Sequence, residues 1–144
     1  MQHLEPSIEQ RLTAEGIRLT QGRKSTILAI ASMDGPRTAA EIHARVGDLV
    51  PLSSLYRSLA VLTEAGVLSS QHSSEGVARF ELAEWFTGHH HHLICVSCGS
   101  VVDVTPTDDQ EHAMTQLMEE MASDAGFTVS SHRFEIEGTC PVCR

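Results

Sequence analysis

The stretch that decides the fold is His89-His90-His91-His92-Leu93-Ile94-Cys95-Val96-Ser97-Cys98-Gly99, and Cys140-Pro141-Val142-Cys143 answers it near the end of the chain. Two Cys-x-x-Cys pairs supply four thiolates, which make a complete tetrahedral shell for zinc. A closed shell of this kind is structural rather than catalytic. The sequence therefore predicts a structural zinc (Zn2+) site formed by Cys95, Cys98, Cys140 and Cys143.

The four consecutive histidines predict two further metal positions. The run continues into Leu93-Ile94, which is typical of a strand, and neighbouring side chains on a strand point to opposite faces. His89 and His91 would then face one way and His90 and His92 the other, as two pairs of metal ligands. A flexible polar loop is the alternative. Imidazole binds zinc, iron, nickel and copper, so the run by itself does not choose the metal.

Composition and charge restrict the class of protein. The 144 residues are 41% hydrophobic, and no apolar run approaches the length of a membrane span. Residues 1–10 lack a signal-peptide pattern, so we expect a cytoplasmic protein whose cysteines bind metal rather than form disulfides. The net charge of −9 lies entirely in residues 81–144, which hold eleven acidic and two basic groups; residues 1–80 hold eight of each. The balanced first half can still carry a basic face.

Residues 1–83 have the pattern of a winged helix-turn-helix. Helices are predicted near residues 7–15, 22–33, 38–46 and 54–65, and a hairpin follows at 67–71 and 77–82. Residues 84–88 are a predicted hinge, and 89–144 a small α/β dimerisation domain with the zinc site. In that domain we expect strands at 101–104, 127–129 and 133–137, and a helix at 108–125 with its methionines inward. Its exposed sheet edge suggests a homodimer. The fold class is α+β.

The last helix before the wing should enter the major groove of double-stranded DNA. Its outward face predicts Ser53, Ser54, Tyr56 and Arg57 as contacts, with a plain solvated helix face as the alternative. Arg18, Arg23 and Lys24 are candidates for phosphate or minor-groove contacts.

These motifs together resemble the ferric uptake regulator family of bacterial metal-sensing repressors. The resemblance rests on Ser54-Leu55-Tyr56-Arg57-Ser58-Leu59, Phe80-Glu81-Leu82, the histidine run and both Cys-x-x-Cys pairs. It implies a repressor of metal homeostasis genes, active as a dimer that binds a palindromic operator when a regulatory metal is bound. That metal would be Zn2+ or Fe2+, with Mn2+ or Ni2+ as further possibilities.

The resemblance also implies the ligands of each site. Glu81, His90 and His92 match the regulatory metal site, and Cys95, Cys98, Cys140 and Cys143 match the structural zinc. His89, His91 and His132 match a second metal site, completed by a helix carboxylate. We expect Glu111 to supply that carboxylate, with Asp108 and Asp109 as the alternatives.

The sequence departs from the family pattern at two places. Pro36 stands where iron-type members usually have a histidine, and residues 82–88 lack the cysteine that zinc-responsive members often have. The fourth regulatory ligand is therefore unassigned, with His43 and His72 as candidates.

Two rival functions are weaker. A zinc-dependent hydrolase would use Glu81 or Glu111 as general base, but no His-Glu-x-x-His pattern is present, and we expect no enzyme. A metal storage protein would leave the helix-turn-helix unexplained.

Overall fold

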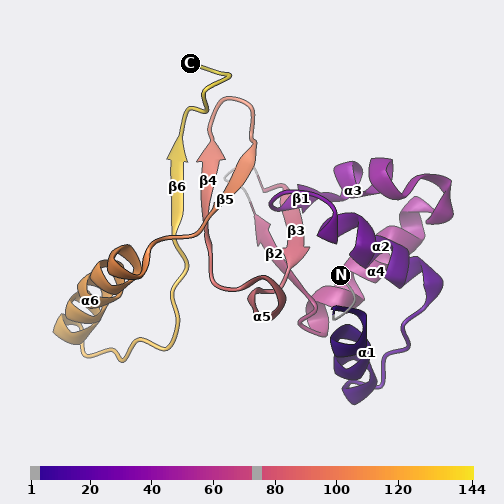
Figure 1. Ribbon diagram of the computed structural model, residues 1–144, viewed down its shortest axis with the longest axis horizontal. Helices are drawn as coiled ribbons and strands as arrows, with labels where there is room; N and C mark the ends of the chain where they lie inside the picture. Colours follow the sequence, from indigo (N-terminus) through magenta and orange to yellow (C-terminus); the bar gives the residue numbers. More distant parts are fainter. Residues whose placement is uncertain (1–3, 73–75) are drawn as a thin grey trace. The chain divides into compact units, whose positions relative to one another are not determined.

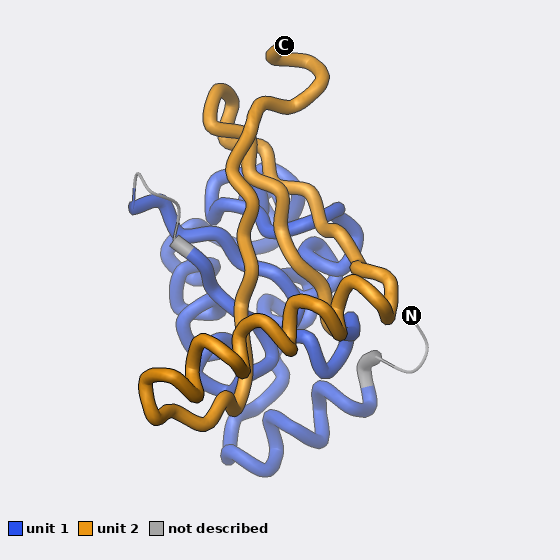
Figure 2. Tube along the Cα trace, turned by 90° about the vertical axis from the view of Figure 1, so that its left-hand side faces the viewer, with its two compact units in different colours: residues 1–88 blue, residues 89–144 orange. Residues whose placement is uncertain are grey.

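The computed structural model describes residues 4–72 and 76–144 of the chain. The chain forms two compact units, Met1–Gly88 and His89–Arg144, coloured blue and orange in Figure 2. Each unit has its own small sheet, so each is described by itself. No helix of the described residues is both long and apolar enough to cross a membrane.

The first unit is a winged helix-turn-helix (Figure 1). Its helices are α1 (Leu4–Ala14), α2 (Gln21–Ala31), α3 (Ala39–Val46), the short η1 (Gly47–Leu49), α4 (Leu52–Glu64) and the single turn α5 (Glu84–Thr87). Its strands are β1 (Arg37–Thr38), β2 (Leu68–His72) and β3 (Ala78–Leu82). They form an antiparallel sheet in the order β1-β3-β2, in which β2 and β3 are the wing hairpin. The order of three helices followed by a hairpin is confirmed.

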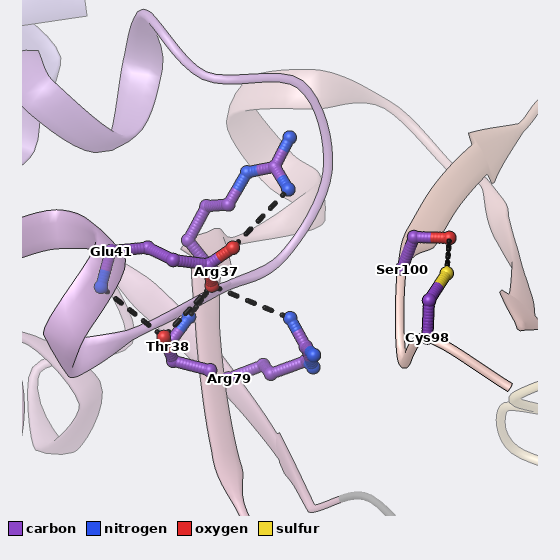
Figure 3. A network of polar contacts seen from close by, with 6 residues as sticks. All are labelled: Arg37, Thr38, Glu41, Arg79, Cys98 and Ser100. Carbon is purple, nitrogen blue, oxygen red and sulfur yellow. Dashed lines mark hydrogen bonds and ion pairs between the residues drawn. The ribbon is translucent and has the colours of Figure 1, made fainter. Parts of the chain in front are cut away.

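Local side-chain bonds explain where α3 begins. The hydroxyl of Thr38 accepts a hydrogen bond from the main-chain N–H of Glu41, and the Glu41 carboxylate accepts one from the main-chain N–H of Thr38 at 2.8 Å. This is the predicted capping box. The guanidinium groups of Arg37 and Arg79 lie 3.7 and 3.5 Å from the same carboxylate (Figure 3). Arg79 is on β3, so the cap also ties α3 to the wing.

The core of the first unit follows from helical periodicity. Leu55, Leu59 and Leu62 share one face of α4, as predicted, and each is at most 1% exposed. They pack with apolar side chains of α1, α2 and α3, including the fully buried Leu12 and Ile42. Truncating one such leucine to alanine typically costs about 2–5 kcal/mol. This core fixes which face of α4 remains outward.

The second unit is a three-stranded sheet with one long helix. Strands β4 (His91–Cys95), β5 (Val101–Val104) and β6 (Glu135–Gly138) form a sheet in the order β5-β4-β6, with β4 antiparallel to β5 and parallel to β6. Helix α6 (Asp108–Asp124) lies between β5 and β6 in the sequence, and Thr107 begins it with a second capping box. The parallel pairing returns the C-terminal segment to the end of β4 (Figure 1).

The second unit also corrects two predictions. Residues 127–129 are not a strand, and Phe127 is 74% exposed. The apolar face of α6 is not inward in the single chain, since Leu117 and Met121 are 58% and 66% exposed and no residue of the helix is buried. The amphipathic pattern is real, but no other element of this unit covers it.

The segment predicted as a hinge contains α5. Phe86 packs against the core of the first unit, and the indole N–H of Trp85 donates a hydrogen bond to the carbonyl oxygen of Gly66 at 2.7 Å. The chain leaves this turn at Gly88, whose φ of 83° lies in the left-handed region that favours glycine.

Candidate metal centres and DNA-binding surface

The four cysteines converge at one end of the sheet of the second unit. Cys95 ends β4 and Cys140 follows β6, so the parallel pairing of those strands brings the two Cys-x-x-Cys pairs together. The four sulfurs lie within 4.8 Å of one another, and those of Cys98 and Cys140 are 3.9 Å apart. Zinc at about 2.3 Å from each of four tetrahedral sulfurs requires sulfur–sulfur separations of about 3.8 Å. The cluster therefore fits a zinc ion.

Hydrogen bonds shift the pKa values of three of these thiols. Main-chain N–H groups, first that of Cys140 and then those of Cys98 and Ser97, lower the pKa of Cys95 to about 6. The Ser100 hydroxyl lies 3.2 Å from the sulfur of Cys98 (Figure 3) and, with the Ser100 main chain, lowers the pKa of Cys98. Hydrogen bonds with the sulfurs of Cys140 and Cys98 raise the pKa of Cys143 to about 12. A cation that binds here must displace the protons that these thiols carry.

A second cluster lies on one face of the start of β4. The Nε2 atoms of His132, His91 and His89 lie 3.0, 3.1 and 3.4 Å from the carboxylate oxygens of Glu111. The Nε2 atoms of His89 and His132 are 3.2 Å apart. Three imidazoles and a carboxylate in contact could hold a first-row divalent metal through mixed nitrogen and oxygen ligands. Of the three carboxylates considered for this position, the structure brings Glu111 into the cluster.

A third cluster lies on the opposite face of β4. The ring centroids of His90 and His92 are 5.1 Å apart, and the Nε2 atom of His92 lies 3.6 Å from a carboxylate oxygen of Asp103. Asp103 is on β5, directly opposite His92 in the antiparallel register. The ligand atoms of these three residues lie within 4.8 Å of one another. Asp103 was missed from the sequence, because only the register of β4 and β5 brings it to His92.

The other residues considered for the regulatory site lie in the first unit. Glu81 is on β3, where the Ser69 hydroxyl and the Gln71 side-chain amide donate hydrogen bonds to its carboxylate at 3.0 and 2.8 Å. His43 is half-buried on α3 and belongs to none of the metal-ligand clusters found among the described residues. The side chain of His72 lies outside the described residues.

The residues predicted to contact DNA lie on α4 and around the start of α2. Ser53, Tyr56 and Arg57 are exposed on the outward face of α4, whereas Ser54 is half-buried. Arg18 is exposed in the loop before α2; Arg23 and Lys24 are half-buried in the first turn of α2. The guanidinium of Arg23 donates to the carbonyl oxygen of Arg18 at 2.5 Å, so this arginine also braces the loop.

Known proteins share this sequence pattern and this arrangement. The ferric uptake regulator family matches residues 14–137. The chain is 32% identical over 136 residues to the zinc uptake regulation protein of Mycobacterium tuberculosis, covering 92% of this chain and 99% of that protein. It is 28% identical over 141 residues to the ferric uptake regulation protein of Bacillus subtilis, covering 94% and 91% of the two chains.

A solved structure extends the comparison to the fold. The crystal structure of the Vibrio cholerae ferric uptake regulator is similar with a TM-score of 0.76 at 25% identity, covering 92% of this chain and 98% of that chain. The match includes both the winged helix-turn-helix unit and the unit with the metal-ligand clusters. The chain therefore belongs to the ferric uptake regulator family.

Proposed function

We propose that this chain, a metal-responsive transcriptional repressor of the ferric uptake regulator family, couples a divalent cation at His90, His92 and Asp103 to operator binding by its winged helix-turn-helix. The observation that carries the proposal is the division of the histidine run between the two faces of β4. Each face is completed by a carboxylate, and the strand follows the DNA-binding unit directly in the sequence.

Glu81 is our proposed further ligand of the regulatory cation. Its carboxylate is oriented by Ser69 and Gln71, and it stands on the wing strand β3. A cation shared by Glu81 and the two histidines would restrict the DNA-binding unit to one arrangement. A coupling of about 1–3 kcal/mol is enough to change operator affinity by about 5- to 150-fold, and DNA must tighten metal binding by the same factor.

The ligand chemistry supports Zn2+ or Fe2+ at the regulatory position. Two imidazole nitrogens with carboxylate oxygens suit both ions, and less strongly Mn2+ or Ni2+. Its relatives include a zinc uptake regulation protein and a ferric uptake regulation protein, which supports the same pair of ions. Zn2+ at the four cysteines would be a permanent structural ion, and its need for reduced thiols supports a cytoplasmic site of action.

Dimerisation in this chain is supported by the uncovered apolar surface of the second unit. Leu117 and Met121 of α6, together with Val102 and Ile136 of the sheet, are between 47% and 66% exposed. Surfaces of this kind are typical of subunit interfaces. Because a twofold dimer presents two copies of α4, we propose a palindromic operator whose half-sites are read by Ser53, Ser54, Tyr56 and Arg57, with Arg18, Arg23 and Lys24 near phosphates.

Operator titrations test the proposal. A duplex would be selected from a random-sequence library with zinc-loaded protein, and its affinity measured over buffered free Zn2+, Fe2+, Mn2+ and Ni2+ with the cysteine site kept loaded. We expect tighter binding as the sensed ion is added. His90→Ala with His92→Ala should abolish that response, while the exposed His112→Ala on α6 should keep it. Equal operator affinity of the wild type at saturating and depleted metal would overturn the proposal.

A further inference from the structure

The C-terminal end of α4 is fixed by main-chain hydrogen bonds of the turn that follows it and by two side chains from other elements. The main-chain N–H of Val67 donates to the carbonyl oxygen of Leu62, and that of Gly66 to the carbonyl oxygen of Thr63, at 2.9 and 3.0 Å. With Gly66 at a φ of 67°, these bonds form a Schellman motif. The motif leaves the carbonyl oxygens of Ala65 and Gly66 to accept hydrogen bonds from elsewhere.

Two side chains from distant parts of the sequence donate to those carbonyls. The Nε–H of Arg11, on α1, donates to Ala65 at 3.0 Å, and the indole N–H of Trp85, on α5, donates to Gly66 at 2.7 Å. The guanidinium of Arg11 also lies 5.8 Å from the centre of the Trp85 ring, within the range of a cation–π contact. A positive group at the C-terminus of a helix is favoured by the helix dipole. Arg11 and Trp85 therefore fix the position of the C-terminal end of α4 jointly, each through one hydrogen bond.

The packing at this point leaves little room for change. A Cβ atom added at Gly66 would lie 3.1 Å from the guanidinium of Arg11. Trp85 is 48% exposed, so about half of its side chain lies outside the core, although its N–H donates to Gly66. We therefore expect Trp85 to act mainly by fixing the position of the helix end rather than by burying apolar surface.

Trp85 is also close in the chain to the metal ligands. It precedes His89 by four residues and His90 by five, so about 18 Å of extended chain at most separates Trp85 from His90. Only four residues therefore lie between Trp85 on α5 and His90.

We propose that Arg11 and Trp85 are positioning residues that connect the linker before the histidine run to the C-terminal end of α4, so that metal binding changes how α4 is presented to DNA. This inference rests on the proposed function, because it assumes that α4 reads the operator in a metal-dependent way. It adds the route within the first unit by which the metal state reaches that helix.

Three substitutions test the connection in the full-length protein. Trp85→Phe keeps an aromatic ring and removes the N–H donor, and Arg11→Gln removes the cation from the other side of the contact. Ser32→Ala is the matched control, because it also removes a side-chain bond to a carbonyl near a helix end, that of Ala29 on α2, away from the linker. Operator affinity is measured for each protein with Zn2+ saturating and with the regulatory site depleted, on the duplex selected with wild-type protein, and thermal melts are recorded alongside.

The measured quantity is the ratio of operator affinities in the two metal states. One hydrogen bond of ordinary net strength corresponds to a factor of about 2 to 12 in an equilibrium constant. We expect Trp85→Phe and Arg11→Gln each to reduce the ratio by about that factor, through weaker binding of the zinc-loaded form, and the double variant to show non-additivity. Ser32→Ala should leave the ratio at the wild-type value.

Trp85 also provides an optical readout, because it is the only tryptophan in the sequence. Its fluorescence is expected to change as Zn2+ fills the regulatory site, and this change should be lost in the His90→Ala, His92→Ala variant. If the wild type responds to metal but Trp85→Phe and Arg11→Gln lower affinity equally in both metal states, the two residues are merely structural and the inference is wrong. If the wild type has a ratio of one with each of Zn2+, Fe2+, Mn2+ and Ni2+, the proposed function fails and the inference fails with it.

Discussion

Removing zinc from the four cysteines is expected to unfold residues 89–144 and leave the first unit folded. In residues 89–144, all of which the structure describes, the buried apolar side chains are Cys95 and Val101. Full burial of a valine contributes about 1.5–3 kcal/mol, whereas a structural zinc contributes about 10–16 kcal/mol of apparent folding free energy. Among its described residues the first unit has sixteen buried apolar side chains in one cluster, so its folding is not expected to depend on the ion.

The strand order specifies what is lost first. All four residues of β6 are exposed, and its pairing with β4 ends beside Cys95 and Cys140. Without a cation joining these cysteines, β6 is held to β4 mainly by main-chain hydrogen bonds. His132 lies just before β6, so the second cluster around Glu111 should lose its metal affinity together with the cysteine site.

Hydrogen exchange followed by mass spectrometry measures this directly. The variant Cys140→Ser with Cys143→Ser should lose protection in peptides covering β4, β6 and α6, while α2 and α4 remain as protected as in the wild type. Val142→Ser is the matched control, because Val142 lies between the two cysteines and is 91% exposed. Zinc-free protein that kept wild-type protection across β4 and β6, or that melted in one transition with the first unit, would refute the reasoning.

Three further predictions concern single side chains. Glu111→Gln should weaken metal binding at the second cluster by at least tenfold in isothermal titration, whereas Asp108→Asn should not, because three imidazoles surround Glu111 and Asp108 is exposed. Replacing Leu117 and Met121 by Glu should convert a dimer to monomer in sedimentation experiments, because buried charge replaces about 1.5–3 kcal/mol of burial per side chain. Burial alone would raise the pKa of Glu41, but hydrogen bonds from Thr38 and the charges of Arg79 and Arg37 outweigh it, and its pKa lies below 4.5. The ionised carboxylate therefore stabilises the fold above pH 4.5, and this contribution is lost as the pH falls through the lower pKa of the folded state. The Glu41 side chain is 42% exposed, so we expect Glu41→Gln to lower the free energy of unfolding by only about 0.5–1 kcal/mol at neutral pH. The variant should also lose less stability than the wild type below pH 4.5, as measured by chemical denaturation at several pH values.

Features that depend on nearby residues could be predicted from the sequence. The cap at Thr38 needs only a hydroxyl and a carboxylate three residues apart, and the core face of α4 needs only helical spacing. The assignment of alternate histidines to opposite faces needs only that β4 be extended. These features could be predicted because each depends on residues close in sequence and not on the register of a sheet or on a partner.

Features that depend on register or on a partner could not be predicted. Asp103 reaches His92 because the turn between β4 and β5, with Gly99 at a φ of 68°, fixes which residues face each other. Glu111 was expected from the family resemblance, but choosing it over Asp108 and Asp109 from helix geometry alone needs the start of α6, since a shift of one residue turns the helix by about 100°. The apolar pattern of α6 predicted a helix correctly but an inward face wrongly, because periodicity does not say whether another element of the chain covers that face.

The division of consecutive histidines between two faces of one strand has a consequence for insertions and deletions. Because the four residues are identical, loss of any one of them gives the same sequence, in which Gly88 takes the place of His89 and the other three histidines keep their faces. Such a deletion removes one ligand from the cluster around Glu111 and leaves His90 and His92 in place. Changing the opposite face without touching that cluster therefore requires a substitution at His90 or His92.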